Sequence, residues 1–366
     1  MDEIEYMRLA IQLARQGCGW VNPNPMVGAV IVKDGKIIGQ GYHKKYGEPH
    51  AERNALANCQ TSTSGATLYV TLEPCCHHGR TPPCTEAIIE SGISRVVVGS
   101  SDPNPLVAGK GIAILHSHGI EVIENVAKNE CNRLNESFFH YIQSRTPYVV
   151  MKYAMTMDGK IATGTGKSQW ITGSAARRRV HEDRHRYSAI MAGVGTVLTD
   201  DPMLTCRLEN SRNPLRIICD TSLRTPLQAK IVTTNDTAPT LIATAVTDTN
   251  RHQPYLNAGC EIMVLPQKDN HIDLNSLMQR LGEKQIDSLL LEGGGTLNWS
   301  ALQSGIVNKV QAYVAPKLFG GSGKTPVEGV GVDHPGKAFL LDKPVITRVG
   351  EDILLESEVI RCIQES

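Results

Sequence analysis

The sequence lacks a net charge, because 37 basic residues are balanced by 37 acidic ones. A neutral chain has no broad basic field of the kind that usually binds nucleic acid, although a local patch is compatible with this balance. No apolar run approaches the ~20 residues that cross a bilayer. The N-terminal residues 1–6 (MDEIEY) are acidic and have no apolar stretch typical of a secretory signal. We therefore expect a cytoplasmic protein with neither a membrane nor a nucleic-acid partner.

The sequence also lacks the dense cysteine pattern of a small disulfide-stabilised domain. Its ten cysteines are scattered over 366 residues, and most are interpreted as small buried apolar side chains in a reducing compartment. The exception is the close group Cys75, Cys76 and Cys84. A chain of this length is too long for one typical domain and suits two.

Strands and helices are expected to alternate along the first part of the chain. Helical spacing or start signals mark 4–14, 50–59, 83–91, 108–118 and 127–143, and β-rich runs mark 27–32, 37–39, 67–72 and 95–99. Asp34-Gly35 is a strong hairpin signal. Alternation of this kind predicts a layered α/β sheet.

A polar stretch at 143–147 ends in proline and is interpreted as a linker. A second α/β series follows, with strands expected at 148–152, 188–194, 215–219, 239–245, 262–265, 288–291 and 310–315. We predict two α/β domains, 1–144 and 147–366.

The richest chemistry lies in the sequence His50-Ala51-Glu52, with Cys75 and Cys84 further along. One imidazole and two thiolates suit zinc, and three protein ligands leave the fourth position open for water, as in catalytic zinc sites. Zinc lowers the pKa of a bound water, and the adjacent Glu52 carboxylate is placed to carry its protons. These residues predict a hydrolytic zinc site of the deaminase type.

Two other interpretations of these residues remain open. A single His or Cys is more often structural than a ligand, and a structural zinc site with four ligands would recruit Cys76, His77 or His78. Cys76 directly follows a ligand and would need a sharp backbone bend, so we interpret it as a neighbour. The spacing is also unusual, because eight residues separate Cys75 from Cys84 where the common signature has two.

The surroundings of the site carry a family resemblance. The matching segments are 22–28 (NPNPMVG), 41–43 (GYH), 47–52 (GEPHAE), 71–75 (TLEPC), 79–84 (GRTPPC), 102–105 (DPNP) and 107–109 (VAG). Together they resemble the RibD family of bifunctional riboflavin-biosynthesis enzymes, including its long loop between the cysteines. The resemblance continues past the linker and covers nearly the whole chain.

The resemblance implies an N-terminal cytidine-deaminase-like three-layer domain. Its reaction is the zinc-dependent hydrolytic removal of the 2-amino group of 2,5-diamino-6-ribosylamino-4(3H)-pyrimidinone 5′-phosphate. The ligands would be His50, Cys75 and Cys84, and Glu52 would be the catalytic residue. Positions near the substrate would be Asn24, His43, Arg80 and Asn104. The chain departs from its relatives at Cys76, where they often carry serine.

The sequence motifs of the second domain indicate its function less clearly. Glycine-rich segments at 193–197 (GVGTV) and 292–296 (EGGGT) follow apolar runs and suit a phosphate cradle, yet such a turn is more often only a tight turn. Neither segment has the Rossmann fingerprint. The basic run 177–179 is more often a solvated helix face than an anion site.

The resemblance again supplies an expectation, carried by 168–172 (SQWIT), 200–207 (DDPMLTCR), 220–224 (DTSLR) and the loop at Glu292. It implies a dihydrofolate-reductase-like domain that uses NADPH to open the ribosyl group, giving 5-amino-6-(5-phosphoribitylamino)uracil. The residues expected to bind NADPH are Ala154, Trp170, Thr196, Asp200, Ser222, Gly294, Gly295 and Thr296. Those expected to bind the reductase substrate are Ser168, Arg184, Leu204, Arg207 and Glu292.

Two competing functions remain open. One is a deaminase of nucleosides or RNA with an unrelated fused domain, against which the neutral charge and the reductase-like second half both argue. The other is a zinc-stabilised binding protein, in which Glu52 would be dispensable. Two sites that handle successive intermediates also favour a homo-oligomer.

Overall fold

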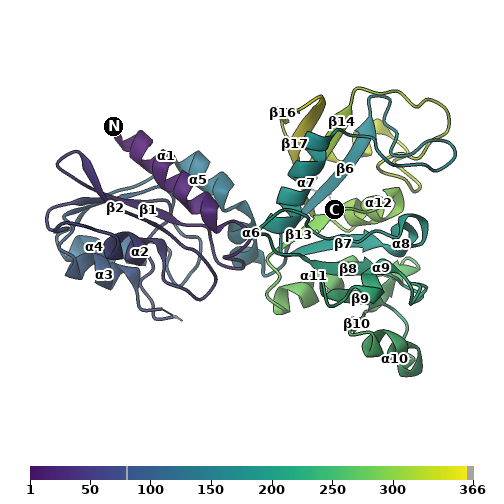
Figure 1. Ribbon diagram of the computed structural model, residues 1–366, viewed down its shortest axis with the longest axis horizontal. Helices are drawn as coiled ribbons and strands as arrows, with labels where there is room; N and C mark the ends of the chain where they lie inside the picture. The colour runs from purple at the N-terminus through teal and green to yellow at the C-terminus, as the bar shows by residue number, and fades with distance from the viewer. Residues whose placement is uncertain (80, 361–366) are drawn as a thin grey trace. The chain divides into compact units, whose positions relative to one another are not determined.

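The computed structural model describes residues 1–79 and 81–360, and the chain divides into two compact units, Met1–Arg145 and Thr146–Ser366 (Figure 1). Each unit has its own mixed α/β sheet and its own apolar core. No helix within the described ranges is long and apolar enough to cross a membrane.

The first unit is built on a five-stranded sheet in the order β2-β1-β3-β4-β5. The strands are β1 Gly28–Lys33, β2 Lys36–Tyr42, β3 Thr67–Val70, β4 Arg95–Val98 and β5 Glu121–Ile123. Strand β1 is antiparallel to both β2 and β3, whereas β3, β4 and β5 run parallel. The carboxyl end of β3 therefore leads directly to the cysteine loop.

The predicted hairpin is confirmed between β1 and β2. Asp34 and Gly35 adopt left-handed φ values of 50° and 74°, which a two-residue turn with the strands' own twist requires. Glycine suits position 35 because it has no Cβ and adopts a positive φ without steric strain.

Helices cover both faces of this sheet, giving three layers (Figure 1). The helices are α1 Glu3–Ala14, α2 Ala51–Ala57, α3 Cys84–Glu90, α4 Lys110–Ser117, α5 Lys128–Leu134 and α6 Glu136–Ser144, with a 3₁₀ turn at Arg15–Gly17. Helices α1 and α5 pack on one face, while α2, α3, α4 and α6 pack on the other. Asp2 begins α1 with a reciprocal capping box to Glu5.

The segment 127–143 is helical as predicted, but it divides at Asn135 into the two helices α5 and α6. The Asn135 side chain accepts from the Met26 N–H at 2.8 Å and donates to the Met26 carbonyl at 2.9 Å. This tertiary contact outweighs the local helical pattern.

The second unit contains a large sheet in the order β10-β9-β8-β7-β13-β6-β14-β17-β15, with β16 also paired to β17. Its central strands are β6 Tyr148–Thr156, β7 Ala189–Gly193, β8 Leu215–Cys219, β9 Thr240–Thr244, β10 Glu261–Val264, β13 Ser288–Leu291 and β14 Val307–Ala315. These seven strands run parallel to one another, and β17 then adds to β14 in the antiparallel direction. Their continuous apolar composition fits a sheet covered on both faces.

The helices of this unit connect the strands and pack on the sheet. They are α7 Ser174–Arg186, α8 Val194–Asp200, α9 Lys230–Thr233, α10 Thr249–Asn257, α11 Leu274–Glu283 and α12 Gly295–Gln303. Buried clusters on the two sides of the sheet supply the core. Helix α8 begins directly after β7, and α12 begins after the short segment 292–294 that follows β13. Both starts therefore lie at the carboxyl ends of strands, where open α/β sheets bind ligands.

Several short or peripheral elements were not predicted. They are the hairpin β11 Gln267–Lys268 and β12 His271–Ile272, the 3₁₀ turn Pro335–Lys337, and the antiparallel strands β15 Leu340–Leu341, β16 Val345–Val349 and β17 Asp352–Ile360. Strand β16 is exposed along most of its length, so its sequence has no clear inward face to reveal it.

Candidate functional site

In the first unit, three side chains that are far apart in sequence converge on one point. Within residues 1–79 and 81–360, one group of His, Cys, Asp or Glu side chains is arranged to hold a metal, and it consists of His50, Cys75 and Cys84. Their ligand atoms all lie within 4.8 Å of one another. The predicted ligands are therefore brought together.

The spacing of these atoms suits a zinc ion. Cys75 Sγ lies 3.5 Å and Cys84 Sγ 3.4 Å from His50 Nδ1. Tetrahedral zinc, with Zn–N of ~2.0–2.1 Å and Zn–S of ~2.3 Å, places nitrogen and sulfur ligands roughly 3.5 Å apart. The residues present thus fit a three-ligand zinc centre.

Local structure explains why the three ligands meet. His50 is the N-cap residue of α2, so its side chain projects from the start of that helix. Cys75 follows β3, and Cys84 is the first residue of α3. The backbone N–H groups of Cys84 and Thr85 donate to the Cys75 carbonyl at 3.1 and 3.2 Å. The long inter-cysteine loop therefore closes on itself at the metal ligands.

The Glu52 carboxyl lies in the first turn of α2 and is 3% exposed. Burial raises its pKa, and the neighbouring Cys75 thiolate raises it further. A carboxylate with a raised pKa is suited to accept and return a proton near neutral pH. Glu52 also lies within hydrogen-bonding reach of Cys84, which places it beside the ligand cluster.

The two thiols differ in acidity. A hydrogen bond with Cys84 holds the pKa of Cys75 well below its usual value, to about 4. The pKa of Cys84 is raised by its hydrogen bond to Cys75 and by burial. Only the thiolate binds a metal, so a cation must displace the remaining proton.

Two neighbours of the cluster have distinct surroundings. Thr81 Oγ1 lies 3.4 Å from His50 Nε2, the ring nitrogen that does not face the sulfurs. Cys76 Sγ instead contacts the Leu106 carbonyl at 3.6 Å. Cys76 is thus outside the ligand group, consistent with its interpretation as a neighbour.

The structure also places Asn24 and His43 together beside His50. Asn24 Nδ2 lies 3.4 Å from His43 Nε2, and the His43 and His50 rings are 5.3 Å apart edge to face. Burial lowers the pKa of His43, so its neutral ring can accept from Asn24 while Nδ1–H donates to the Pro49 carbonyl at 3.2 Å.

Of the other two expected deaminase-substrate residues, Arg80 lies outside the described residues. Asn104 is half-buried in the loop before α4, where its side-chain oxygen accepts from the Leu106 N–H at 3.1 Å. This loop is tied to the cysteine loop through Glu73, which accepts from the Asp102 N–H at 3.4 Å.

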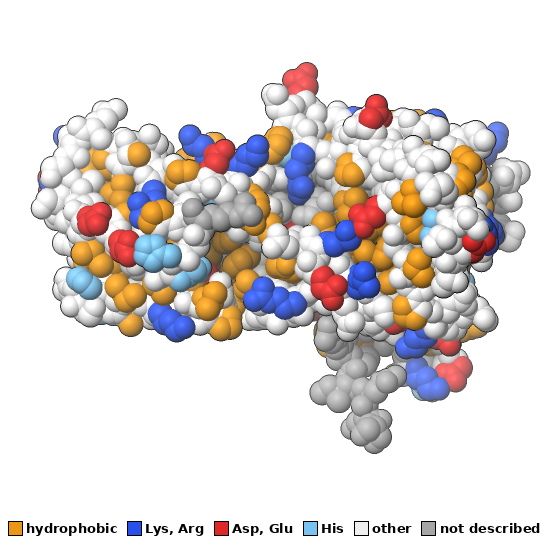
Figure 2. All heavy atoms as spheres, turned by 90° about the horizontal axis from the view of Figure 1, so that it is seen from below, with side chains coloured by type: hydrophobic (Ala, Val, Ile, Leu, Met, Phe, Trp, Pro, Cys, Tyr) orange, Lys and Arg blue, Asp and Glu red, His pale blue; other side chains and the backbone are white. Residues whose placement is uncertain are grey.

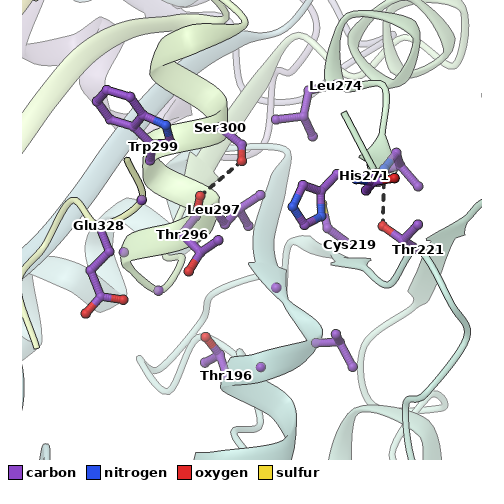
Figure 3. A pocket seen from close by; sticks show the side chains of 18 of the residues that line it. Thr196, Cys219, Thr221, His271, Leu274, Thr296, Leu297, Trp299, Ser300 and Glu328 are labelled. Atoms are coloured by element: carbon purple, nitrogen blue, oxygen red, sulfur yellow. Dashed lines mark hydrogen bonds between the residues drawn. The ribbon is translucent and has the colours of Figure 1, made fainter. Parts of the chain in front are cut away.

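In the second unit, a cavity of about 870 Å³ lies at the carboxyl ends of the parallel strands. Figure 3 shows Thr221 and His271 on one side of it, with Trp299 and Glu328 on the other. Thr196 of α8 lines the lower edge of the same view. The volume is in the range of pockets for sizeable organic ligands.

Two helices open onto this cavity at their N-termini. Helix α8 follows Gly193 and α12 follows Gly294, and no side chain among the described residues caps either first turn. A Cβ built at Gly195 would meet no atom within 4 Å. Backbone N–H groups that have no side-chain cap and face open space suit an anion such as a diphosphate. The donor set therefore fits a dinucleotide.

The expected cofactor residues are only partly on the cavity wall. Those that line it are Thr196, Asp200, Ser222, Gly294, Gly295 and Thr296, together with the expected substrate residue Ser168. Ala154 and Trp170 are not on that wall. Trp170 is exposed and lies under the Arg177 guanidinium, 4.7 Å from the ring centre.

The remaining expected reductase-substrate residues include the two partners of an ion pair, Arg184 and Glu292, whose side chains are 14% and 12% exposed. Arg184 Nε and Nη2 donate to the Glu292 carboxylate at 2.8 and 3.0 Å, and Lys152 Nζ lies 3.5 Å from it. Arg184 Nη1 also donates to the Thr205 carbonyl at 3.0 Å, next to the buried Leu204. Arg207 is more exposed and contacts His181 Nε2 at 3.1 Å.

Sequence reasoning missed one wall of the cavity. Lys268 and His271 line it from the β11–β12 hairpin, whose two turn residues Asp269 and Asn270 have φ values of 51° and 63°. An Asp-Asn pair is itself a turn signal. The flanking strands have only two residues each, which is too short for a periodic pattern to be recognised in the sequence.

Comparisons with known proteins match both units. The description "Cytidine and deoxycytidylate deaminase zinc-binding region" matches residues 1–100, and "RibD C-terminal domain" matches residues 147–355. The riboflavin biosynthesis protein RibD of Actinobacillus pleuropneumoniae is 56% identical over 98% of this chain and 96% of its own length. That of Escherichia coli K12 is 39% identical over 97% and 99%.

Solved structures match over nearly the whole chain. The diaminohydroxyphosphoribosylaminopyrimidine deaminase/5-amino-6-(5-phosphoribosylamino)uracil reductase of Thermotoga maritima has a TM-score of 0.84 and 39% identity, and covers 98% of this chain and 99% of its own. Acinetobacter baumannii RibD has a TM-score of 0.87 and 37% identity over the same shares. Both resemblances extend across the two units.

Proposed function

Because the chain belongs to the RibD family, a family of bifunctional deaminases and reductases of riboflavin biosynthesis, we propose that it catalyses two successive steps on one pyrimidine. The first removes the 2-amino group of 2,5-diamino-6-ribosylamino-4(3H)-pyrimidinone 5′-phosphate by hydrolysis. The second reduces the ribosyl group to give 5-amino-6-(5-phosphoribitylamino)uracil.

The residues proposed for the deaminase site belong to the first unit. His50, Cys75 and Cys84 would hold zinc, which would supply an activated water when bound. The buried Glu52 carboxylate would carry a proton from water to the departing ammonia. Its position beside the ligand cluster and its raised pKa support this role.

The substrate-binding roles rest on position and chemistry. The neutral His43 ring and the Asn24 amide, next to His50, offer hydrogen-bond groups for the pyrimidine edge. Asn104 is proposed to contact the substrate from the loop before α4, and Arg80 to bind its phosphate, since a guanidinium can form two parallel bonds to phosphate.

The reductase site is proposed in the second unit. NADPH supplies the hydride, and the start of α8 and of α12 would bind its diphosphate. Cofactor roles are assigned to Ala154, Trp170, Thr196, Asp200, Ser222, Gly294, Gly295 and Thr296, and substrate roles to Ser168, Arg184, Leu204, Arg207 and Glu292. The ionised Glu292 fixes the Arg184 fork, which holds that side of the site in one geometry.

We further propose that the deaminase occupies 1–144 and the reductase 147–366. The compact units and the two matched regions support this division. A small phosphorylated pyrimidine is the partner. Figure 2 shows Lys and Arg interspersed with Asp and Glu on the face in view, which agrees with a chain that does not bind nucleic acid. A cytoplasmic location stays a prediction.

A homo-oligomer is proposed as well, with contact through the exposed strands of the second unit. Leu340, Val345 and Ile346 are 54%, 51% and 67% exposed. Within the described residues, β16 pairs on one side with β17, and an edge strand of this kind can pair with another chain. Sedimentation velocity should show a dimer or larger species, and Ile346→Glu should shift it to monomer. Monomeric wild-type protein at micromolar concentration would refute this part.

The convergence of His50, Cys75 and Cys84 next to the buried Glu52 is the observation that carries the proposal. The test is a coupled assay that follows ammonia release from the diaminopyrimidine phosphate and NADPH oxidation after it, with cytidine as the competing substrate. Ammonia from cytidine alone would support a nucleoside deaminase, and zinc binding without ammonia release would support a non-catalytic zinc protein.

A further inference from the structure

Glu73 is a buried carboxylate with an unusual set of partners, all of them backbone N–H groups. Its side chain is 3% exposed. Oε1 accepts from Gly111 at 3.1 Å and Ile112 at 3.4 Å, and Oε2 accepts from Gly109 at 3.0 Å and Asp102 at 3.4 Å. One side chain thus holds both the loop before α4 and the start of that helix.

The same region shows a close approach between backbones. A Cβ at Gly111 would lie 2.2 Å from the Pro74 carbonyl oxygen, so α4 can rest on Pro74 only because residue 111 has no side chain. Pro74 directly precedes the ligand Cys75. The start of α4 is therefore packed against the segment that presents the first thiolate.

A chain of contacts leads from Glu73 to Asn104. Glu73 accepts from the Asp102 N–H, and Asp102 Oδ1 accepts from the Asn104 N–H at 2.8 Å. Asn104 in turn orders the next turn, since its carbonyl accepts from Val107 and Ala108 at 2.8 and 2.9 Å. The Asn104 loop is thereby fixed with respect to the cysteine loop.

We propose that Glu73 is a positioning residue of the deaminase: it locks the Asn104 loop onto the zinc-ligand segment and so sets where the substrate lies relative to the metal. This inference rests on the proposed function, in which Cys75 binds zinc and Asn104 contacts the substrate. In this proposal Glu73 contacts neither the atoms that bind the metal nor the substrate. It acts through Asp102 and Asn104.

A simpler role would be to cap α4 and nothing more, and the two roles predict different measurements. A pure helix cap contributes stability that any capping carboxylate contributes, without effect on the Michaelis constant. Loss of positioning weakens substrate binding while the metal and Glu52 remain in place, which raises KM and leaves kcat nearly unchanged.

The test compares Glu73→Gln with Asp2→Asn in the full-length, zinc-loaded enzyme. The glutamine keeps one acceptor oxygen but turns an NH₂ group towards two of the four N–H donors. Asp2 is a matched control, because it caps α1 of the same unit through the Glu5 N–H at 2.8 Å. Deaminase kinetics, zinc content, and backbone amide exchange over residues 102–112 are measured for each.

For Glu73→Gln we expect KM for the pyrimidine phosphate to rise about tenfold with kcat within about threefold of wild type, since charge-assisted hydrogen bonds are lost. Zinc content and reductase activity stay at the wild-type level, and amide exchange over 102–112 accelerates. Asp2→Asn shows none of these changes. If Glu73→Gln does not fold, Asp102→Ala should give the same rise in KM, because it cuts the link to Asn104 alone.

Unchanged amide exchange over 102–112 in Glu73→Gln would overturn the inference whether or not the enzyme deaminates this substrate, as would an equal rise in KM for Asp2→Asn. Failure of the proposed function looks different. In that case Asn104→Ala would have a wild-type KM, or the wild-type enzyme would release no ammonia, while the exchange data would still report on the role of Glu73.

Discussion

Arg184 and Glu292, 108 positions apart in the chain, form a two-pronged ion pair of 2.8 and 3.0 Å inside the second unit. Burial opposes ionisation of Glu292, but Arg184 and then Lys152 outweigh it and lower its pKa from 4.5 to about 2. Because the folded pKa lies below the unfolded one, the stability that this pair contributes is complete above about pH 4.5 and is lost as the pH falls towards 2. The pKa difference is worth about 3 kcal/mol.

Arg184→Met should therefore lower the free energy of unfolding by about 3 kcal/mol at neutral pH, because it leaves a buried carboxylate with only Lys152 beside it. The gap between variant and wild type should narrow by about pH 4, where Glu292 of the variant is protonated. Urea unfolding at the two pH values measures this. The double variant Arg184→Met/Glu292→Leu should recover part of the loss, and an equal loss at both pH values would contradict the assignment.

Removal of the metal should separate the two activities. A chelator that extracts zinc should abolish ammonia release, while NADPH oxidation on the deaminated substrate continues, because the ligands all belong to the first unit. Added zinc should restore the first activity. His50→Ala should behave like the chelated enzyme and bind less than about a tenth of an equivalent of zinc, since only two ligands remain. Loss of both activities on chelation would argue against the assignment of zinc to the deaminase alone.

The contact between Thr81 and His50 predicts a change in zinc affinity. Thr81→Val should weaken zinc binding by about tenfold, because a partner on the second ring nitrogen orients a ligating imidazole. Thr81→Ser keeps the hydroxyl and should stay near wild type. Competition with a chromogenic chelator measures both variants. An affinity of Thr81→Val equal to that of Thr81→Ser would show that the 3.4 Å contact contributes nothing.

The open N-terminus of α8 predicts a selective loss of NADPH binding. Gly195→Asp places a carboxylate beside the proposed diphosphate position, and KM for NADPH should rise at least about tenfold through like-charge repulsion. Gly195→Asn has the same shape without the charge and should rise less. Neither should unfold, since a Cβ at 195 meets open space and an acidic residue suits a first helical turn. Equal effects of the two variants would place the phosphates elsewhere.

Local signals in the sequence identified the parts of the fold and the site that depend on neighbouring residues. Asp34-Gly35 specifies its own turn, and the helix start at His50 follows from the residues around it. What the sequence could not reveal depends on distant partners. The break at Asn135 is fixed by Met26, 109 residues away. Glu73 has no distinguishing sequence signal, and its role depends on backbone N–H groups around the start of α4.

The cavity in the second unit shows the same division. The glycine-rich starts of α8 and α12 stand out in the sequence, and both line the cavity. The opposite wall comes from the short β11–β12 hairpin, and His271 faces the cavity in Figure 3. This residue reaches the cavity only because the fold brings the hairpin next to α8 and α12, which are distant in the sequence. Such a contribution has no periodic signature in the sequence.

The most direct test of the central claim, that zinc and Glu52 perform the first reaction while a separate site performs the second, is the pair of activities of Glu52→Ala in the full chain. The account predicts a protein with wild-type zinc content that releases no measurable ammonia from the diaminopyrimidine phosphate, yet oxidises NADPH on the deaminated substrate at the wild-type rate. Ammonia release at the wild-type rate, or loss of both activities in a folded variant, would contradict it.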